Sequence, residues 1–285
     1  MLKEKENVVT DTRYFYGPLN DHISMIKKDI IKTLIIMGPC GTGKTTLVNY
    51  LVPDAVRIGG HITSAKLYEA LYNASDNKII FFDDTEDLLS NDVSLTLLKQ
   101  ALDTNKQRVV MWDSSTKRDA PPSFLFNSRV IFCMNKIPDD EGMKAIISRC
   151  HKCAVEFSYK ELLILMYEIA KKQKVLNGTV ISAEERKSVV DFIKDNSDIT
   201  TEDFDLRLQN KVEEYYIYNK LKWKKLALGL LNIKNEKLRI FKEIEEMDIS
   251  VEQKIQLWSE RARLGKSSYY NYRKIYEKRS KNPMF

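Results

Sequence analysis

A glycine-rich segment near the N-terminus has the residue types and spacing of a phosphate-binding loop. Small residues allow backbone N–H groups to approach phosphate oxygens, and the start of a following helix adds the positive end of its dipole. The lysine that closes the segment is expected to reach the β- and γ-phosphates, and the threonine after it to bind Mg²⁺. We therefore predict that a nucleoside triphosphate is bound by Gly38, Pro39, Cys40, Gly41, Thr42, Gly43, Lys44, Thr45 and Thr46.

An apolar run that ends in two carboxylates follows further along the chain. Residues 78–82 precede Asp83 and Asp84. We expect Asp83 to hold Mg²⁺, directly or through water, together with the Thr45 hydroxyl. Asp84 is expected to orient the attacking water as general base, with Glu86 as the alternative base. The two segments predict an ATPase that uses ATP and Mg²⁺.

The elements that must position these groups alternate between strands and helices. Apolar strand-like runs lie at Thr33–Met37, Ala55–Ile58, Ile79–Phe82, Val130–Met134 and Cys153–Phe157, with helical spacing in between at Ser64–Tyr72 and Val93–Leu102. This alternation predicts a largely parallel sheet that is covered on both faces. After Ser158 the pattern becomes that of amphipathic helices, at Glu161–Lys174, Ala183–Lys194, Leu206–Tyr218 and Leu221–Leu231.

Two further polar residues narrow the class of ATPase. The run 129–134 ends at Asn135, and Arg149 lies in a Ser-Arg-Cys segment just before the next strand. Together with the phosphate loop and the acidic pair, this order resembles AAA+ ATPases of the clamp-loader and initiator branch. The resemblance implies that Asn135 helps to place the attacking water, and that Arg149 acts as an arginine finger in the ATP site of a neighbouring subunit. It also implies a homo-oligomer, with a hexameric ring as the expected form.

The resemblance covers about residues 30–230 and implies an α/β fold. That fold is the AAA+ three-layer parallel sheet with an α-helical lid, here followed by a small C-terminal helical domain. In the lid, Arg207 lies where a second sensor arginine would contact the nucleotide, and an ordinary surface arginine is the alternative. The predicted domains are an N-terminal linker at 1–30, the ATPase core at 31–157, the lid at 158–232 and a helix-turn-helix-like domain at 233–285.

The Asp-Asp pair departs from the usual Asp-Glu of AAA+ proteins and resembles superfamily III helicases of viruses and plasmids. Those helicases carry a basic β-hairpin between the acidic strand and the asparagine, and the hairpin grips DNA. Segments 105–112 and 115–126 are the candidates for such a hairpin here, with Trp112 available to stack on bases. A plain surface loop is the alternative. The candidate nucleic-acid contacts are Lys106, Arg108, Lys117 and Arg118.

The C-terminal segment resembles a helix-turn-helix, with helices expected at Val251–Ala262 and Ser267–Lys278 around a turn that contains Gly265. The last 25 residues hold eight basic side chains and one acidic one, whereas the whole chain carries a net charge of +6. A basic terminus on a nearly neutral body suggests an anionic partner such as DNA, with Arg273 and Lys274 as candidate contacts. A helical pair that packs against another subunit is the alternative.

Composition also bears on whether the protein is globular, secreted, membrane-bound or zinc-binding. Hydrophobic residues make up 43% of the 285 residues, enough for a substantial core. The charged N-terminus does not resemble a secretory signal, and no apolar run approaches the roughly 20 residues that span a bilayer. We therefore expect a cytoplasmic protein without a membrane partner. The four cysteines fit a reduced chain, and the Cys150-His-Lys-Cys153 spacing lacks the second pair that a zinc site needs.

The leading functional hypothesis is an oligomeric AAA+ motor that acts on nucleic acid. It would be a DNA replication helicase or a helicase or clamp loader of a mobile element, with a replication protein as a further partner. An alternative is an ATP-dependent protein-remodelling or regulatory switch whose C-terminal domain docks a protein. A third hypothesis is a slow, ATP-bound scaffold, because Asp84 is shorter than the usual glutamate.

Overall fold

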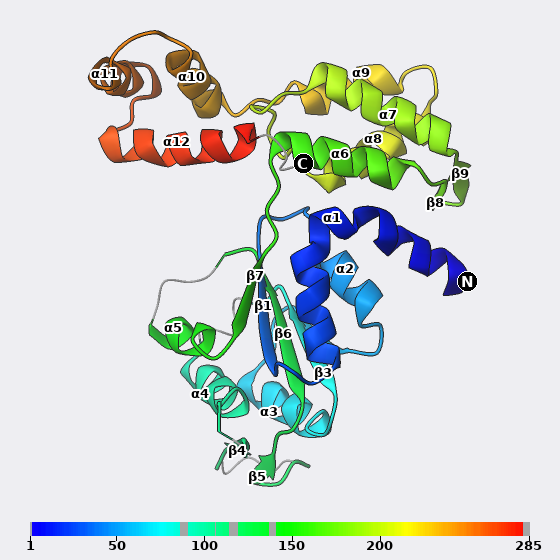
Figure 1. Cartoon of the computed structure of the whole chain (residues 1–285), viewed down its shortest axis with the longest axis vertical. Coiled ribbons are helices and arrows are strands. Elements are labelled where there is room, and N and C mark those ends of the chain that lie inside the picture. The colour runs from blue at the N-terminus through cyan, green and yellow to red at the C-terminus, as the bar shows by residue number, and fades with distance from the viewer. Residues whose placement is uncertain (1, 86–90, 106, 114–118, 137–140, 282–285) are drawn as a thin grey trace. The chain divides into compact units, whose positions relative to one another are not determined.

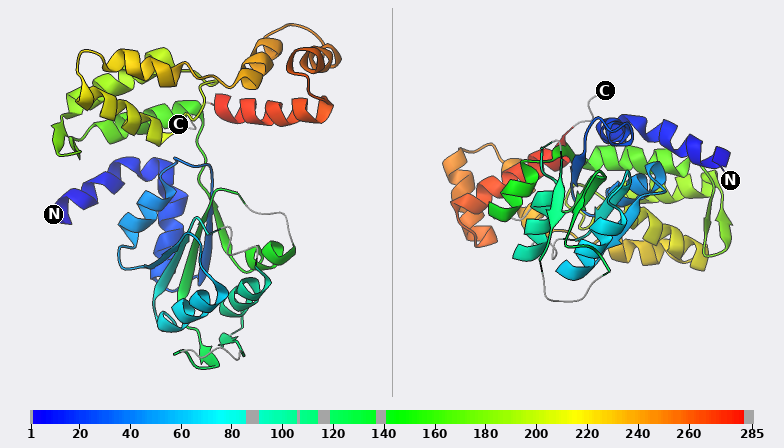
Figure 2. Two further views of the ribbon diagram at one scale, coloured as in Figure 1. Left: turned by 180° about the vertical axis from the view of Figure 1, so that it is seen from behind. Right: turned by 90° about the horizontal axis from the view of Figure 1, so that it is seen from below.

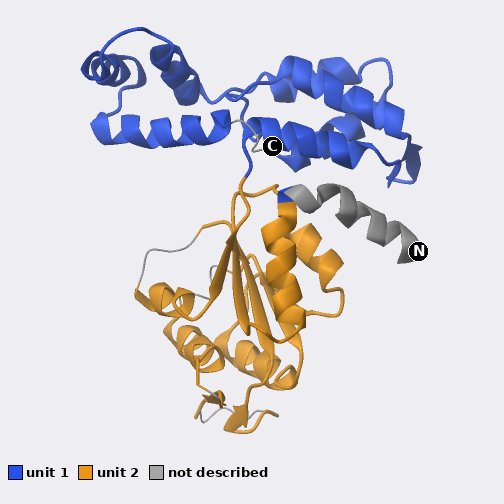
Figure 3. Cartoon of the chain, in the orientation of Figure 1, with its two compact units in different colours: residues 1–15, 157–285 blue, residues 16–156 orange. Residues whose placement is uncertain are grey.

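The computed structural model describes residues 2–85, 91–105, 107–113, 119–136 and 141–281, with side chains from residue 15 onward. The chain divides into two compact units, residues 16–156 and residues 157–285 with 1–15 (Figure 3). No helix among the described residues is both long and apolar enough to cross a membrane. Four residues named in the sequence analysis lie outside the described residues, namely Glu86, Lys106, Lys117 and Arg118.

A five-stranded parallel sheet forms the centre of the unit 16–156, in the order β2-β3-β6-β1-β7. The parallel α/β prediction is confirmed. The last strand lies two residues earlier at its start than predicted, because it is an edge strand in which only Cys153 is buried. The strands are β1 (Thr33–Met37), β2 (Val56–Gly59), β3 (Ile79–Asp83), β6 (Arg129–Met134) and β7 (His151–Ala154).

Helices cover both faces of this sheet. The second half of α1 (Leu2–Lys27) and α2 (Lys44–Leu51) lie on one face, and α3 (Ser64–Asn73), α4 (Asp92–Ala101) and α5 (Glu141–Ile147) on the other (Figure 1 and Figure 2). On the second face, Leu67, Leu98 and Met143 share one core cluster with Phe82 and Phe132. Because successive strand residues point to opposite faces, a sheet covered on both sides needs continuous apolar strands, which accounts for the runs in the sequence.

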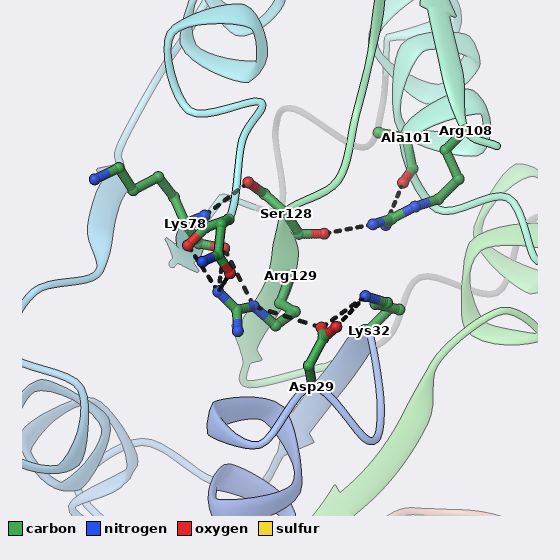
Figure 4. A network of polar contacts seen from close by, with 8 residues as sticks. Asp29, Lys32, Lys78, Ala101, Arg108, Ser128 and Arg129 are labelled. Carbon is green, nitrogen blue, oxygen red and sulfur yellow. Dashed lines mark hydrogen bonds and ion pairs between the residues drawn. The ribbon is translucent and has the colours of Figure 1, made fainter. Parts of the chain in front are cut away.

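A polar network holds the N-terminal ends of β3 and β6 together (Figure 4). The Arg129 guanidinium donates from Nη2 to the carbonyl oxygen of Asn77 at 2.8 Å and from Nε to that of Lys78 at 3.4 Å. Its Nε also lies 3.9 Å from Asp29 Oδ1. The basic residue that opens the strand β6 therefore fixes the edge of the sheet opposite to the phosphate loop.

A short antiparallel hairpin precedes β6, formed by β4 (Val109–Met111) and β5 (Ser123–Leu125). A hairpin in this region is confirmed, with shorter strands than predicted. Phe124 on its inner side packs against Tyr68, with ring centroids 5.2 Å apart. Val109, Met111 and Leu125 are exposed, so the described outer face of the hairpin is apolar.

The unit 157–285 begins with four helices, in agreement with the predicted helical segment. The Ser182–Glu185 capping box is present at the start of the second helix. A two-stranded hairpin, β8 (Lys174–Leu176) and β9 (Thr179–Ile181), follows the first helix and was missed. Its Asn177–Gly178 turn, with both φ angles positive, is the signal that could have found it. The helices are α6 (Tyr159–Ala170), α7 (Ala183–Asn196), α8 (Leu206–Tyr218) and α9 (Trp223–Leu231).

A buried carboxylate joins three elements of this helical group. Glu213 on α8 is fully buried, and its Oε1 accepts hydrogen bonds from Arg186 Nε at 2.8 Å and Gln209 Nε2 at 3.0 Å. Its Oε2 lies 2.9 Å from Lys174 Nζ. Because both oxygens have cationic partners, the cost of burying this charge is offset.

Three further helices follow, α10 (Glu236–Glu245), α11 (Val251–Ala262) and α12 (Lys266–Ser280). They pack around Phe241, Trp258 and Tyr269. In the turn between α11 and α12 the left-handed residue is Arg263 (φ 55°), and Gly265 is the N-cap of α12. The predicted helix, turn and helix are thus present, although the glycine does not supply the left-handed conformation.

Candidate nucleotide site

The phosphate loop, residues 38–43, joins the C-terminal end of β1 to α2. Gly41 (φ 72°) and Gly43 (φ 80°) adopt left-handed backbone, which glycine takes without steric cost. Gly38 passes so close to the chain after β7 that a Cβ there would lie 2.0 Å from the carbonyl oxygen of Val155. The backbone of the loop is therefore held against the sheet in a form that only small residues allow.

Lys44 is the first residue of α2, and its side chain folds back over the loop. It is 5% exposed. Its Nζ donates to the carbonyl oxygens of Gly38 and Pro39, both at 2.7 Å, and to Asn135 Oδ1 at 3.3 Å. The ammonium thus lies inside the loop with three oxygen partners, whereas Cys40 and Thr46 are exposed.

Thr45 and Asp83 meet directly. The Thr45 hydroxyl donates to Asp83 Oδ1 at 2.8 Å, and Asp83 is only 4% exposed. Its other oxygen, Oδ2, accepts from Arg57 Nη2 at 2.5 Å. A hydroxyl and a carboxylate are hard oxygen ligands of the kind that Mg²⁺ prefers, so these residues fit the predicted metal. Arg57 was not foreseen, because a lone arginine in a strand carries no motif.

Asp84 and Asn135 complete the group. Asn135 Nδ2 donates to Asp84 Oδ1 at 3.1 Å, while Asn135 Oδ1 accepts from Lys44. Asp84 is exposed and adopts left-handed backbone (φ 51°), and its N–H reaches the carbonyl oxygen of Cys133 at 3.4 Å. We call Lys44, Thr45, Asp83, Asp84 and Asn135 the polar cluster.

The cluster comes together because β1, β3 and β6 are adjacent and parallel. Their C-terminal ends therefore meet at one edge of the sheet, and α2 begins at the same edge. Burial raises the pKa of the Cys133 thiol, next to this edge, to about 11, which favours the protonated thiol at neutral pH.

A tyrosine from the N-terminal helix also contacts the loop. Tyr16 is 6% exposed and its hydroxyl donates to the carbonyl oxygen of Thr42 at 2.6 Å. Burial raises the pKa of this hydroxyl, so it remains a neutral donor. Helix α1 is kinked at Tyr16, two residues before Pro18, as expected where a proline cannot donate its backbone hydrogen bond. The aromatic run at residues 14–16 carries no motif, so this contact was not predicted.

Arg149 lies at the end of α5, immediately before β7. Its Nη1 donates to the carbonyl oxygen of Ala145 at 2.6 Å, and its own carbonyl accepts from the Thr33 hydroxyl at 2.6 Å. Among the described residues, its hydrogen bonds are thus with α5 and β1 rather than with the polar cluster. Arg207 is exposed in the first turn of α8, where Asp205 caps its N–H at 2.7 Å. It belongs to the other compact unit.

The structure corrects the prediction for Arg108. This side chain is 6% exposed, and its guanidinium donates to the carbonyl oxygens of Ala101 at 2.9 Å and Ser128 at 2.7 Å (Figure 4). It also lies 5.1 Å from the centre of the Phe126 ring. A phosphate cannot reach a guanidinium that is buried and engaged with backbone carbonyls, so Arg108 is structural rather than a nucleic-acid contact.

The remaining basic candidates lie on α12. Arg273 Nε donates to Glu277 Oε1 at 3.0 Å, and this partner raises the pKa of Arg273. Lys274 is exposed and has no ion-pair partner among the described residues. The exposed face of α12 also carries Lys266, Ser267 and Asn271. A polar and basic face on the second helix of the pair fits the helix-turn-helix interpretation.

The fold is that of AAA+ ATPases: a parallel sheet in this strand order, a phosphate loop after its central strand, and a helical region after the last strand. The chain superposes on a variant of RuvB from Thermotoga maritima with a TM-score of 0.51 and 15% identity, covering 93% of this chain and 85% of that one. The T. maritima RuvB structure described as a Holliday junction branch migration motor gives a TM-score of 0.48 and 15% identity, covering 94% and 86%.

A phage protein is related in sequence. An uncharacterised 36.7 kDa protein from the nrdC–mobD intergenic region of Enterobacteria phage T4 is 25% identical over 222 residues, which cover 70% of this chain and 68% of the phage protein. No protein-family model matches the chain.

Proposed function

We propose that this chain binds ATP with Mg²⁺ at the phosphate loop and hydrolyses it, as an oligomeric AAA+ ATPase that acts on DNA. The observation that carries the proposal is the polar cluster. Residues from three separate segments meet at one edge of the sheet, and their chemistry covers each task of phosphoryl transfer: a cation, two metal-ligand oxygens, and a carboxylate–amide pair for water.

The residues divide the reaction between them. Lys44 balances the charge of the β- and γ-phosphates. Thr45 and Asp83 would hold Mg²⁺, which would supply positive charge for the phosphate oxygens. Asp84 and Asn135 orient a water against the γ-phosphorus. The new bond from the water oxygen forms as the bond to the bridging oxygen of ADP breaks, and Asp84 accepts the proton of the water.

A phosphate-release assay tests this activity. Lys44→Ala should abolish nucleotide binding, and Asp84→Asn should retain ATP binding but lose most turnover, because an amide cannot accept the proton. Unchanged turnover in Asp84→Asn would exclude Asp84 as the base. Lys66→Ala is a matched control, since Lys66 is an exposed lysine on α3 whose partner is Glu69.

The active form in this proposal is a homo-oligomeric ring in which Arg149 serves the ATP site of a neighbour. Supporting this, Arg149 lies in the turn after α5, and its guanidinium donates to the carbonyl oxygen of Ala145. Among the described residues, it makes no hydrogen bond or ion pair with the polar cluster. A cation from the neighbouring subunit would add positive charge beside the γ-phosphate, where negative charge develops in the transition state. Size-exclusion chromatography with light scattering, with and without ATP, measures the assembly.

DNA is the proposed substrate, contacted by the exposed face of α12. Lys274 and Arg273 are the phosphate contacts and Asn271 is placed for a base edge. Fluorescence anisotropy with single-stranded and duplex oligonucleotides, at about 50 mM salt, measures binding and its salt dependence. Binding that does not weaken as salt rises would argue against contacts to phosphates.

Within this class we propose a replication helicase or loader of a phage or other mobile element. The phage relative and the RuvB-like fold support this assignment. Strand displacement that depends on ATP would support a helicase. ATP-dependent DNA binding without displacement would favour a loader.

A protein-remodelling switch is the second candidate. The observation in its favour is the apolar outer face of the β4–β5 hairpin, where Val109, Met111 and Leu125 are 41%, 58% and 51% exposed. Apolar side chains suit a protein surface better than a DNA backbone. ATPase activity that DNA does not stimulate, combined with an absence of DNA binding, would favour this candidate.

A further inference from the structure

Arg57 is a cation that contacts the polar cluster, although no motif contains it. It lies on β2, the edge strand next to β3, and its Nη2 is 2.5 Å from Asp83 Oδ2. Among the described residues, Asp83 is the one side chain that its guanidinium contacts. The Arg57 side chain is 54% exposed, while that of Asp83 is 5% exposed.

The register of β2 and β3 explains how the contact forms. Arg57 pairs with Phe81 and Gly59 pairs with Asp83, so Arg57 and Asp83 lie on the same face, two residues apart along the strands. Gly59 has no side chain between them, and a Cβ there would lie 3.3 Å from the carbonyl oxygen of Asp83. The long arginine side chain on the same face therefore reaches the Asp83 carboxylate from the neighbouring strand.

The contact divides the Asp83 carboxylate between two partners. Oδ1 takes the Thr45 hydroxyl and Oδ2 takes the guanidinium, so the buried negative charge is balanced without a metal. Mg²⁺ held at Thr45 and Asp83 would draw on the same carboxylate. The arginine and the metal are thus alternative partners for a single charge.

We propose that Arg57 is a positioning residue of the metal site, which holds Asp83 in place before Mg²⁺ binds and competes with Mg²⁺ for it. The inference rests on the proposed function, because it takes Asp83 as the Mg²⁺ ligand. Its consequence is that Arg57 sets how strongly nucleotide binding depends on Mg²⁺. When Mg²⁺ replaces Arg57 as the partner of Asp83, the Arg57 guanidinium is released and lies beside the nucleotide.

The test compares the affinity for a fluorescent N-methylanthraniloyl ATP analogue in EDTA and in saturating MgCl₂. The dissociation constant in EDTA divided by that in MgCl₂ measures how strongly Mg²⁺ favours nucleotide binding. Arg57→Gln should increase this ratio roughly twofold to fivefold, as expected for the loss of a half-exposed ion pair. Arg57→Lys, which keeps the charge, should stay within about twofold of wild type, as should the exposed control Lys66→Gln.

The direction in which the ratio of dissociation constants changes in Arg57→Gln tests the inference separately from the proposed function. An unchanged or smaller ratio in Arg57→Gln, with normal Mg²⁺-dependent binding by wild type, would overturn this inference and leave the proposed function intact. Absence of nucleotide binding by wild type would overturn both. Circular dichroism in EDTA checks that Arg57→Gln is folded, and the Arg57→Lys ratio tests the inference independently of that variant.

Discussion

Replacing Asn135 by alanine should slow ATP hydrolysis while leaving ATP binding largely unchanged. Asn135 accepts a hydrogen bond from Lys44 at 3.3 Å and donates one to Asp84 at 3.1 Å. Lys44 would keep its two carbonyl partners, both at 2.7 Å, whereas Asp84 would lose its one side-chain contact among the described residues. The variant therefore disturbs the orientation of the water more than the binding of phosphate.

The size of the effect follows from the lost contact to a charged group. Such a hydrogen bond contributes about 1.5–3 kcal/mol, which corresponds to roughly a 10- to 150-fold loss of kcat if the contact acts in the transition state. The dissociation constant for ATP should change by less than about threefold, because the Lys44 ammonium remains in the loop.

Steady-state phosphate release gives kcat, and binding of a fluorescent ATP analogue gives the dissociation constant. Asn127→Ala is the matched control, since Asn127 lies at the opposite end of β6 and its side chain is exposed. A kcat for Asn135→Ala within about threefold of wild type would refute the reasoning, as would a loss of ATP affinity as large as the loss of kcat/KM.

Three further outcomes are expected. An equal mixture of Lys44→Ala and Arg149→Ala subunits should regain about a quarter of wild-type ATPase activity. Random mixing places an intact Lys44 opposite an intact Arg149 at that share of subunit interfaces. A mixed oligomer that recovers no activity would contradict an arginine supplied in trans. Glu213→Ala should lower the free energy of unfolding of its unit by about 3–5 kcal/mol in urea titrations, since the buried Arg186 and the partly buried Lys174 lose their carboxylate partner. Lys274→Ala should weaken DNA binding and reduce the slope of log affinity against log salt concentration by about one, without changing stability. Arg108→Ala should instead lower the melting temperature. The reverse pattern would reject both assignments.

The alternation of strands and helices was predictable because each core strand is buried on both faces. β1 and β6 therefore read as continuous apolar runs, and β1 lies at the predicted residues. The edge strand β7 was displaced in the prediction, because Val155 and Phe157 are apolar but lie after its end. The hairpin β8–β9 was missed because its strands have three residues each, and the segment between two predicted helices was taken as a turn.

Some residues carried no sequence signal for their role. Arg108 resembles a basic hairpin residue, and its burial follows only from the packing of Phe126 and the carbonyls of Ala101 and Ser128 around it. Arg57 and Tyr16 reach the site from an edge strand and a kinked helix, which are distant from the motifs in sequence. Such contacts depend on register and kink geometry, which local patterns do not encode.

The sequence by itself determined the phosphate loop and the residues after β3 and β6, because glycines, a lysine and strand-terminal polar residues at fixed spacing have few other uses. Only the tertiary structure decided how they combine. The order of the parallel strands brings Lys44, Asp84 and Asn135 into one chain of contacts. It also gives the carboxylate of Asp83 a second partner in Arg57, because neighbouring strands, rather than neighbouring residues, decide which charges meet.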